Sequence, residues 1–320
     1  ALPIYKNGKN SARSDYAVLR LGNDENERQS NRNIINGNLF LNNGNVLNET
    51  NLAIRVSAYS YENVIQKNNI KNCVIGISGG IDSSVIIGLL NEVSKNIPDL
   101  NIYAKCYLFK DIYENFEYKY IKSLTNKFKN NKQIHFETIN IENYSDISGI
   151  NKDDKNLLGQ GSYAFRYHKM FIEAQKIGNC IVIGTTNLDE FSYSGWFGKN
   201  SDMMVDIQVI IDWHKFEVIA AAKELGIPEI IINRTPTGDL VDNTTDEDNF
   251  GCNYDELSYI SYFMCNKFKN KKLDDIKDYI VNNFEKLHTL NKKNSHKYNG
   301  QTFNPIMIVN NKKFFKYYNK

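Results

Sequence analysis

The feature of the sequence that most restricts its fold is a short apolar run that leads directly into a loop of small residues. Cys73 to Ile77 is a short run of apolar residues around one glycine, which is typical of a central parallel strand. The chain continues as Gly76-Ile77-Ser78-Gly79-Gly80-Ile81-Asp82-Ser83-Ser84, and the pattern from Ser84 to Val93 favours a helix. A buried strand that passes through a tight loop into a helix predicts the start of a βαβ unit.

The same alternation continues along the chain. A strand, a helix, a strand, a helix and a strand are predicted in turn at 102–109, 113–128, 134–139, 163–176 and 180–183. This order implies right-handed βαβ units. We therefore predict an α/β fold with a doubly wound parallel sheet, followed by a mostly helical C-terminal part from about 213 to 290.

The N-terminal region has a different composition. Residues 7–51 are rich in Asn, Ser, Gly and Arg and lack a periodic apolar pattern, which predicts a weakly ordered arm. Asn42-Asn43-Gly44-Asn45 lies between two apolar runs and fits a small hairpin, because Asn and Gly tolerate positive φ. We predict an irregular arm over 1–50, with a possible hairpin, and one folded domain over 51–320, which opens with a helix.

Charge, apolar runs and cysteines exclude several classes of protein. The formal net charge is +2, so bulk charge gives no reason to expect nucleic-acid binding. No run reaches the length of a membrane-spanning helix, and we expect no signal peptide. The cysteines match neither a zinc site nor a disulfide framework, and Cys73, Cys106 and Cys180 are expected to be buried thiols. We therefore expect a cytoplasmic protein with no membrane or nucleic-acid partner.

The loop at 76–84 has the properties of an anion site. Its two adjacent glycines let the backbone turn sharply and approach a ligand closely. Backbone N–H groups then point inward beside the positive end of the next helix, and the hydroxyls of Ser78, Ser83 and Ser84 add donors. The alternative is an ordinary strand-to-helix turn, which explains an isolated Gly-Gly pair better than the whole Ser-Gly-Gly-x-Asp-Ser pattern.

Asp82 indicates a metal ion. A carboxylate in a phosphate cradle repels the ligand unless a divalent cation lies between them, and Mg²⁺ prefers such oxygen ligands. The loop has no Lys, so it is not a Walker-type loop. A second carboxylate, Glu190, follows the fourth predicted strand, and ligands bind at the carboxyl ends of parallel strands. We expect Glu190 to share the Mg²⁺ with Asp82; alternatively, Asp189 and Glu190 only favour a helix N-terminus.

The loop and a series of later residues resemble a known family. Ser-Gly-Gly-x-Asp-Ser is similar to the loop of the PP-loop, or N-type ATP pyrophosphatase, superfamily, which implies an adenine nucleotide alpha hydrolase-like fold. The later residues are Gly184-Thr185 with Glu190, Gly195-Trp196-Phe197-Gly198-Lys199, Asp202 with Asp206-Ile207, Lys215, Pro236-Thr237, Asp246-Glu247 with Gly251, and Tyr254. In this order they are similar to the ammonia-dependent NAD synthetase family over roughly 72–259, and weakly again at His296-Lys297.

The resemblance implies sites for ATP and Mg²⁺. Positions that match ATP-binding residues of the family are Gly76, Ser78, Gly79, Gly80, Asp82, Ser83, Ser84, Thr185, Lys215 and Thr237. Asp82 and Glu190 would bind Mg²⁺ and act in catalysis. The loop would hold the β- and γ-phosphates while a substrate carboxylate attacks the α-phosphorus, which forms an acyl-adenylate and pyrophosphate.

The resemblance also implies a dinucleotide site. The matching substrate-binding positions are Arg166, Lys199, Asp202, Asp206, His296 and Lys297. Lys199 is also expected to act in catalysis, since a flexible ammonium can stabilise charge near the reacting carboxylate or phosphate. His296 and Lys297 match a pair that closes over the substrate in the family; alternatively, a pair near a terminus is simply exposed to solvent.

Three features depart from the family pattern. Met203-Met204 replaces two glycines, which changes backbone freedom and pocket volume and leaves the exact carboxylate substrate open. The helix before the fourth strand carries Arg166 as the candidate for the family's substrate-binding arginine, and the register of this match stays open by one or two residues. The basic, proline-containing run that follows His-Lys in the family is replaced by Tyr298-Asn299-Gly300.

Together these features predict a ligase that forms a C–N bond. The expected reaction amidates deamido-NAD with ammonia and converts ATP to AMP and pyrophosphate. The residues before Cys73 are too few for a glutaminase domain, so free ammonia is expected unless a separate subunit supplies it. The resemblance also implies a homodimer. Two alternatives stay open: a ligase for another carboxylate such as nicotinate mononucleotide, and a non-catalytic nucleotide-binding homologue.

Overall fold

A single parallel sheet organises the chain. The computed structural model describes residues 65–66, 68–110, 118–237, 245–258, 260, 284–297 and 306–307. The six parallel strands have the order β3-β2-β1-β4-β5-β6. They are β1 (Asn72–Gly76), β2 (Asn101–Phe109), β3 (Ile134–Ile141), β4 (Cys180–Gly184), β5 (Ile207–Gln208) and β6 (Ile306–Met307). The predicted α/β fold with a parallel sheet is confirmed.

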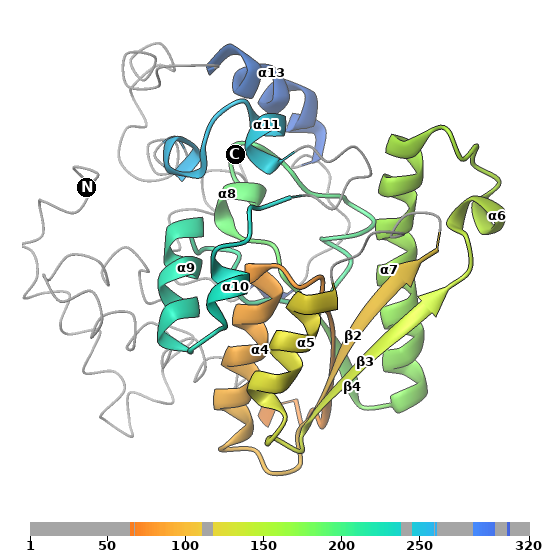
Figure 1. Ribbon diagram of the computed structural model, residues 1–320, viewed down its shortest axis with the longest axis vertical. Helices are drawn as coiled ribbons and strands as arrows, with labels where there is room; N and C mark the ends of the chain where they lie inside the picture. Colours follow the sequence, from red (N-terminus) through yellow and green to blue (C-terminus); the bar gives the residue numbers. More distant parts are fainter. Residues whose placement is uncertain are drawn as a thin grey trace, which may run out of the picture.

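Helices cover both faces of this sheet, as a doubly wound fold requires (Figure 1). One face carries α4 (Ile81–Ser94), α5 (Tyr118–Phe128), α9 (Lys215–Glu224) and α10 (Glu229–Ile232), and the other carries α7 (Lys155–Ile177). The short helices α6 (Tyr144–Ser148), α8 (Leu188–Phe191) and α11 (Asp246–Phe250) precede α13 (Phe284–Asn294) and the 3-10 turn η5 (Ser295–Lys297). The part predicted to be mostly helical, from about 213 to 290, is therefore mostly helical where it is described.

The central strand β1 is buried on both faces of the sheet. Cys73, Val74 and Ile75 have no exposed surface, because helices cover both faces of the sheet. Successive side chains point to opposite faces. Cys73 and Ile75 pack with α4, α5 and α9, whereas Val74 packs with Met170 of α7. A continuous apolar run is thus what this position in the sheet requires.

The strand order creates a switch point between β1 and β4. From β1 the chain moves outward through β2 to β3, and then returns to the other side of β1 as β4. Open α/β sheets bind ligands at the carboxyl ends of the strands at such a point. The loop at 76–84 leaves β1 here, and the segment that leads to Glu190 leaves β4 here.

Some elements differ from those expected. The helix predicted at 163–176 starts earlier, at Lys155, since the Asp154 carboxylate accepts a hydrogen bond from Leu157 N at 3.1 Å and caps it. β5 and β6 have two residues each, too few to give an alternating pattern. Cys180 is partly exposed, which corrects the prediction that it is buried, whereas Cys73 and Cys106 are buried as expected.

Other expectations lie outside the described residues. They include the arm over 1–50, its possible hairpin, the boundary at residue 51, residues 49–64 of the opening helix expected at about 49–66, and residues 113–117 of the helix predicted at 113–128. Of the helices in the described ranges, none combines the length and the apolar character needed to cross a membrane.

Candidate functional site

The loop at 76–84 turns sharply at Gly79. This residue has φ of +78°, and a Cβ atom there would lie 2.8 Å from Cβ of Tyr120, so only glycine fits. The Gly80 amide donates to Ser78 Oγ at 3.2 Å, and the Ser84 hydroxyl donates to the Gly80 carbonyl at 2.8 Å. Because Gly80 is the N-cap of α4 and has no side chain, the first N–H groups of the helix can face an anion.

A cavity of about 250 Å³ opens at the carboxyl ends of β1 and β4. Its walls come from the loop at 76–84, from α7, from the segment after β4, from the start of α9 and from 234–237. The predicted site residues that line it are Gly76, Ser78, Gly80, Asp82, Ser83, Arg166, Thr185, Glu190, Asp202, Lys215 and Thr237. The structure therefore brings most of the predicted ATP-binding positions to one place.

Six predicted residues are not part of the cavity lining: Gly79, Ser84, Lys199, Asp206, His296 and Lys297. The Asp206 carboxylate accepts a hydrogen bond from Val182 N at 2.7 Å and so binds the backbone of β4. Lys199 Nζ donates to the His296 carbonyl at 2.7 Å, and Lys297 Nζ donates to the Gly195 carbonyl at 2.9 Å. These two bonds hold η5 against the segment at 195–199, next to Trp196 of the cavity wall.

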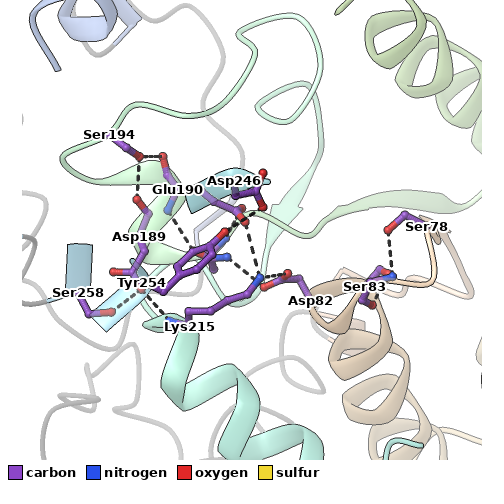
Figure 2. A network of polar contacts seen from close by, with 12 residues as sticks. Ser78, Asp82, Ser83, Asp189, Glu190, Ser194, Lys215, Asp246, Tyr254 and Ser258 are labelled. Carbon is purple, nitrogen blue, oxygen red and sulfur yellow. Dashed lines mark hydrogen bonds and ion pairs between the residues drawn. The ribbon is translucent and has the colours of Figure 1, made fainter. Parts of the chain in front are cut away.

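Lys215 is the charged centre of the cavity. Figure 2 shows its side chain reaching toward Asp82 and Glu190. Its Nζ lies 2.5 Å from Asp82 Oδ2 and 4.0 Å from Glu190 Oε1. The Lys215 side chain is 4% exposed. Burial lowers its pKa, but the two carboxylates more than offset this and raise the pKa of Lys215 to about 12. Lys215 is therefore an ammonium ion at neutral pH.

Asp82 and Glu190 approach one another from neighbouring strand ends. Burial, followed by the charge of Asp82, raises the pKa of Glu190 well above its usual range. The side-chain Nδ2 of Asn187 donates to Asp82 Oδ1 at 3.0 Å, and the backbone N–H of Asn187 donates to Glu190 Oε2 at 3.3 Å. Glu190 thus forms a capping box at α8, as the alternative interpretation expected, and also faces the cavity.

These two carboxylates fit a divalent cation. They repel one another, and carboxylate oxygens together with phosphate oxygens are ligands that Mg²⁺ prefers. Within the described ranges, no group of three or more His, Cys, Asp or Glu side chains could hold a metal ion alone. A cation at Asp82 and Glu190 would therefore need ligands from a bound substrate.

Some cavity residues were not assigned from the sequence: Lys105, Tyr163, Tyr167, Trp196, Arg234 and Asp246. Arg234 Nη1 donates to the Ser78 carbonyl at 3.2 Å, and Asp246 accepts from the Tyr254 hydroxyl at 3.1 Å. Asp246 belongs to a segment that carries the family resemblance, and Arg234 lies two residues before Pro236 of another such segment. The resemblance could therefore have pointed to both residues. Lys105 lies within the apolar strand β2 and gave no such signal.

The two methionines that depart from the family pattern do not line the cavity. Met203 is 1% exposed and belongs to the protein interior. The expectation that Met203-Met204 changes the pocket volume directly is therefore wrong for the described cavity.

Glu217 near the start of α9 gives a pH-dependent contribution to stability. Burial raises its pKa from 4.5 to about 7, and its carboxylate accepts a hydrogen bond from His214 N at 2.8 Å. Because the folded state binds this proton more tightly than the unfolded state, the contribution is present below pH 4.5 and is lost as pH rises through 7. We expect Glu217→Gln to gain stability relative to the unchanged protein over this interval. Urea denaturation at several pH values from 4.5 to 7 measures the free energy of unfolding of both proteins. A difference between the two that does not change with pH would contradict this expectation.

The fold and the site together define a nucleotide-binding α/β protein, with an anion loop and two carboxylates at the switch point of a doubly wound sheet. The family model described as NAD synthase matches residues 53–300. The chain belongs to the NAD synthase family and is an enzyme of the ligase class.

Curated relatives agree with this family, and solved structures share its fold. The chain is 32% identical to "NH(3)-dependent NAD(+) synthetase" of Thermoplasma volcanium, over 71% of this chain and 87% of that protein. It is 28% identical to the protein of the same name from Thermococcus sibiricus, over 73% of this chain and 89% of the relative. NMN synthetase from Francisella tularensis has a similar fold, with a TM-score of 0.61, 22% identity and coverage of 78% and 95%. NH3-dependent NAD synthetase from Campylobacter jejuni also has a similar fold, with a TM-score of 0.56 and 18% identity, over 78% of this chain and 96% of that protein.

Proposed function

We propose that this chain amidates deamido-NAD with ammonia to form NAD, and converts ATP to AMP and pyrophosphate in the reaction. Family membership and the names of the relatives support this reaction. The observation that carries it is the meeting of the loop at 76–84 with Asp82, Glu190 and Lys215 in one cavity. With a divalent cation at the two carboxylates, this set can hold a triphosphate and compensate part of its charge.

ATP would lie with its phosphates at the loop. The first N–H groups of α4 face the β- and γ-phosphates, and Lys215 adds a positive charge beside them. Thr185, Arg234 and Thr237 supply further polar groups from the cavity wall. Asp82 and Glu190 would hold Mg²⁺ with phosphate oxygens, and the ion would neutralise phosphate charge when bound.

The pyridine nucleotide would enter between α7 and the segment at 195–202. Arg166 and Asp202 line that side of the cavity. The carboxylate oxygen of the pyridine nucleotide attacks the α-phosphorus of ATP. The bond from the α-phosphorus to the oxygen that bridges to the β-phosphorus breaks, and pyrophosphate leaves. Ammonia then attacks the acyl carbon and AMP leaves with the former carboxylate oxygen. The protein contributes positioning and charge compensation, and no side chain forms a covalent intermediate.

Lys199 lies outside the cavity lining, and we propose that it acts on the substrate together with η5. Its bond to the His296 carbonyl holds the pair His296-Lys297 beside the cavity wall. We expect Lys199→Ala to lower kcat/KM for the dinucleotide by about tenfold or more, because a charge near the reacting groups is lost. Lys152→Ala is the matched control, since Lys152 has a 62% exposed side chain and lies outside the cavity lining. Steady-state kinetics that give equal effects would remove Lys199 from the site.

The oligomeric state and the domain division are also proposed. We expect a homodimer, with residues 1–50 as a separate arm attached to the domain at 51–320. Sedimentation velocity on the full chain and on a chain that starts at residue 51 tests both. A monomer would contradict the first proposal, and loss of folding in the shortened chain would contradict the second.

The substrate is tested with purified protein, ATP, Mg²⁺ and ammonium. Deamido-NAD and nicotinate mononucleotide are offered separately, and NAD or NMN is measured together with pyrophosphate. We expect the higher kcat/KM with deamido-NAD. A preference for the mononucleotide would identify a ligase with the alternative substrate. Nucleotide binding without pyrophosphate from either would indicate a non-catalytic homologue.

A further inference from the structure

A buried carboxylate outside the cavity lining joins three separate segments behind Lys215. Asp189 lies in α8 and has no exposed surface. Its Oδ1 pairs with His214 Nδ1 at 2.8 Å, and its Oδ2 accepts from Lys215 N at 2.8 Å and from the Ser258 hydroxyl at 2.7 Å. Figure 2 shows Asp189 and Ser258 on the side of Lys215 away from the loop at 76–84.

The contacts of Asp189 lie at the start of α9. The first N–H groups of a helix have no partner within the helix, and a carboxylate at that end stabilises it. Two carboxylates lie at this helix start: Glu217 of α9 itself accepts from His214 N, and Asp189 of α8 accepts from Lys215 N. The Leu188 amide also donates to the Trp213 carbonyl at 2.8 Å, so three bonds tie α8 to residues 213–215 at the start of α9. The Cα of Lys215 is thereby fixed relative to the end of β4.

The position of Lys215 in turn determines the charge pattern of the cavity. Its ammonium is 2.5 Å from Asp82 and 4.0 Å from Glu190, so a small shift of its backbone would lengthen both approaches. Asp189 itself does not line the cavity. An isolated buried carboxylate is costly, and this one is compensated by three donors. A carboxylate in this place is more than a helix needs, because an uncharged Ser, Thr or Asn caps helices equally well.

We propose that Asp189 is a positioning residue that acts through Lys215: by holding the Lys215 backbone and pairing with His214, it fixes the ammonium at the phosphate end of the cavity. The inference rests on the proposed function, in which Lys215 contacts ATP. Ser258 attaches the helical segment at 254–258 to the same carboxylate oxygen, so this segment is part of the support.

The test is a double-mutant cycle between Asp189→Asn and Lys215→Met. The affinity for a non-hydrolysable ATP analogue with Mg²⁺ is measured by calorimetry in all four proteins, and circular dichroism checks the fold. We expect Asp189→Asn to weaken binding by about tenfold when Lys215 is present and to have almost no effect in the Lys215→Met background. Equal losses in both backgrounds would show a general structural role and overturn the proposal.

A second pair of variants covers the case in which Asp189→Asn does not fold. His214→Asn keeps a donor near the position of Nδ1, whereas His214→Leu removes it. We expect His214→Leu to weaken analogue binding only when Lys215 is present, and His214→Asn to bind nearly as well as the unchanged protein. Equal behaviour of the two His214 variants would overturn the pairing with Asp189.

Failure of the proposed function is distinguishable in the same experiment. If Lys215→Met alone leaves analogue binding unchanged, the assignment of Lys215 to ATP is wrong, and the role of Asp189 is overturned with it. If Lys215→Met weakens binding but the effect of Asp189→Asn is additive, only the role of Asp189 is wrong.

Discussion

Asp82→Asn is expected to lower turnover by at least about 100-fold while the protein keeps its fold. The amide has the shape of the carboxylate and can still accept the bond from Asn187 Nδ2. It removes the negative charge that pairs with Lys215 and that would bind Mg²⁺ together with Glu190. The loss therefore falls on the chemical step and on metal-dependent nucleotide binding rather than on folding.

Steady-state kinetics and circular dichroism on Asp82→Asn and Asp99→Asn measure this effect. Asp99 is the matched control because its side chain is 76% exposed and lies outside the cavity lining. Turnover of the Asp82 variant within a few-fold of that of the control would refute the metal assignment. A loss of the folded signal would show instead that the pair with Lys215 is mainly structural.

Lys215→Met is expected to weaken ATP binding and to destabilise the protein by about 3 kcal/mol. Methionine keeps an apolar chain of similar length but leaves two carboxylates facing one another. The Asp82 and Glu190 side chains are 18% and 19% exposed, so water compensates them only in part. The cost is at the lower end of the range for breaking a buried ion pair, since Glu190 can take up a proton.

Urea denaturation and nucleotide titration compare Lys215→Met with Lys223→Met. Lys223 is an exposed residue in the last turn of the same helix, so the control keeps the substitution and the element constant. Equal stabilities would mean that the ion pair contributes little. We also expect added Mg²⁺ to recover part of the stability of Lys215→Met but not to change Lys223→Met, because the cation can compensate the two carboxylates.

The sequence predicted the part of the fold that local signals specify. The unit from β1 through the loop at 76–84 to α4 was visible because a buried strand, a glycine turn and a helix follow one another without interruption. The approach of Asp82 to Glu190 was predicted from a general rule on parallel strand ends, although they are far apart in the chain. Both carboxylates indeed lie near Lys215.

Other features depended on contacts that no local pattern records. β5 and β6 are too short to be periodic. Asp206 lies in a segment that matches the family, yet its carboxylate binds Val182 N, because the chain approaches β4 there. Asp189 is predicted at most to favour a helix N-terminus; it lies in the first turn of α8, and its carboxylate also accepts from Lys215 N at the start of α9. Such placements follow from tertiary packing alone.

An oxygen-isotope experiment tests most directly whether the substrate carboxylate attacks the α-phosphorus of ATP. Deamido-NAD labelled with ¹⁸O in its carboxylate is incubated with the protein, ATP, Mg²⁺ and ammonium, and mass spectrometry locates the label in the products. We expect one ¹⁸O atom in AMP and none in pyrophosphate, because the carboxylate attacks the α-phosphorus. Label in pyrophosphate or inorganic phosphate, or NAD formation without labelled AMP, would contradict an acyl-adenylate formed in this cavity.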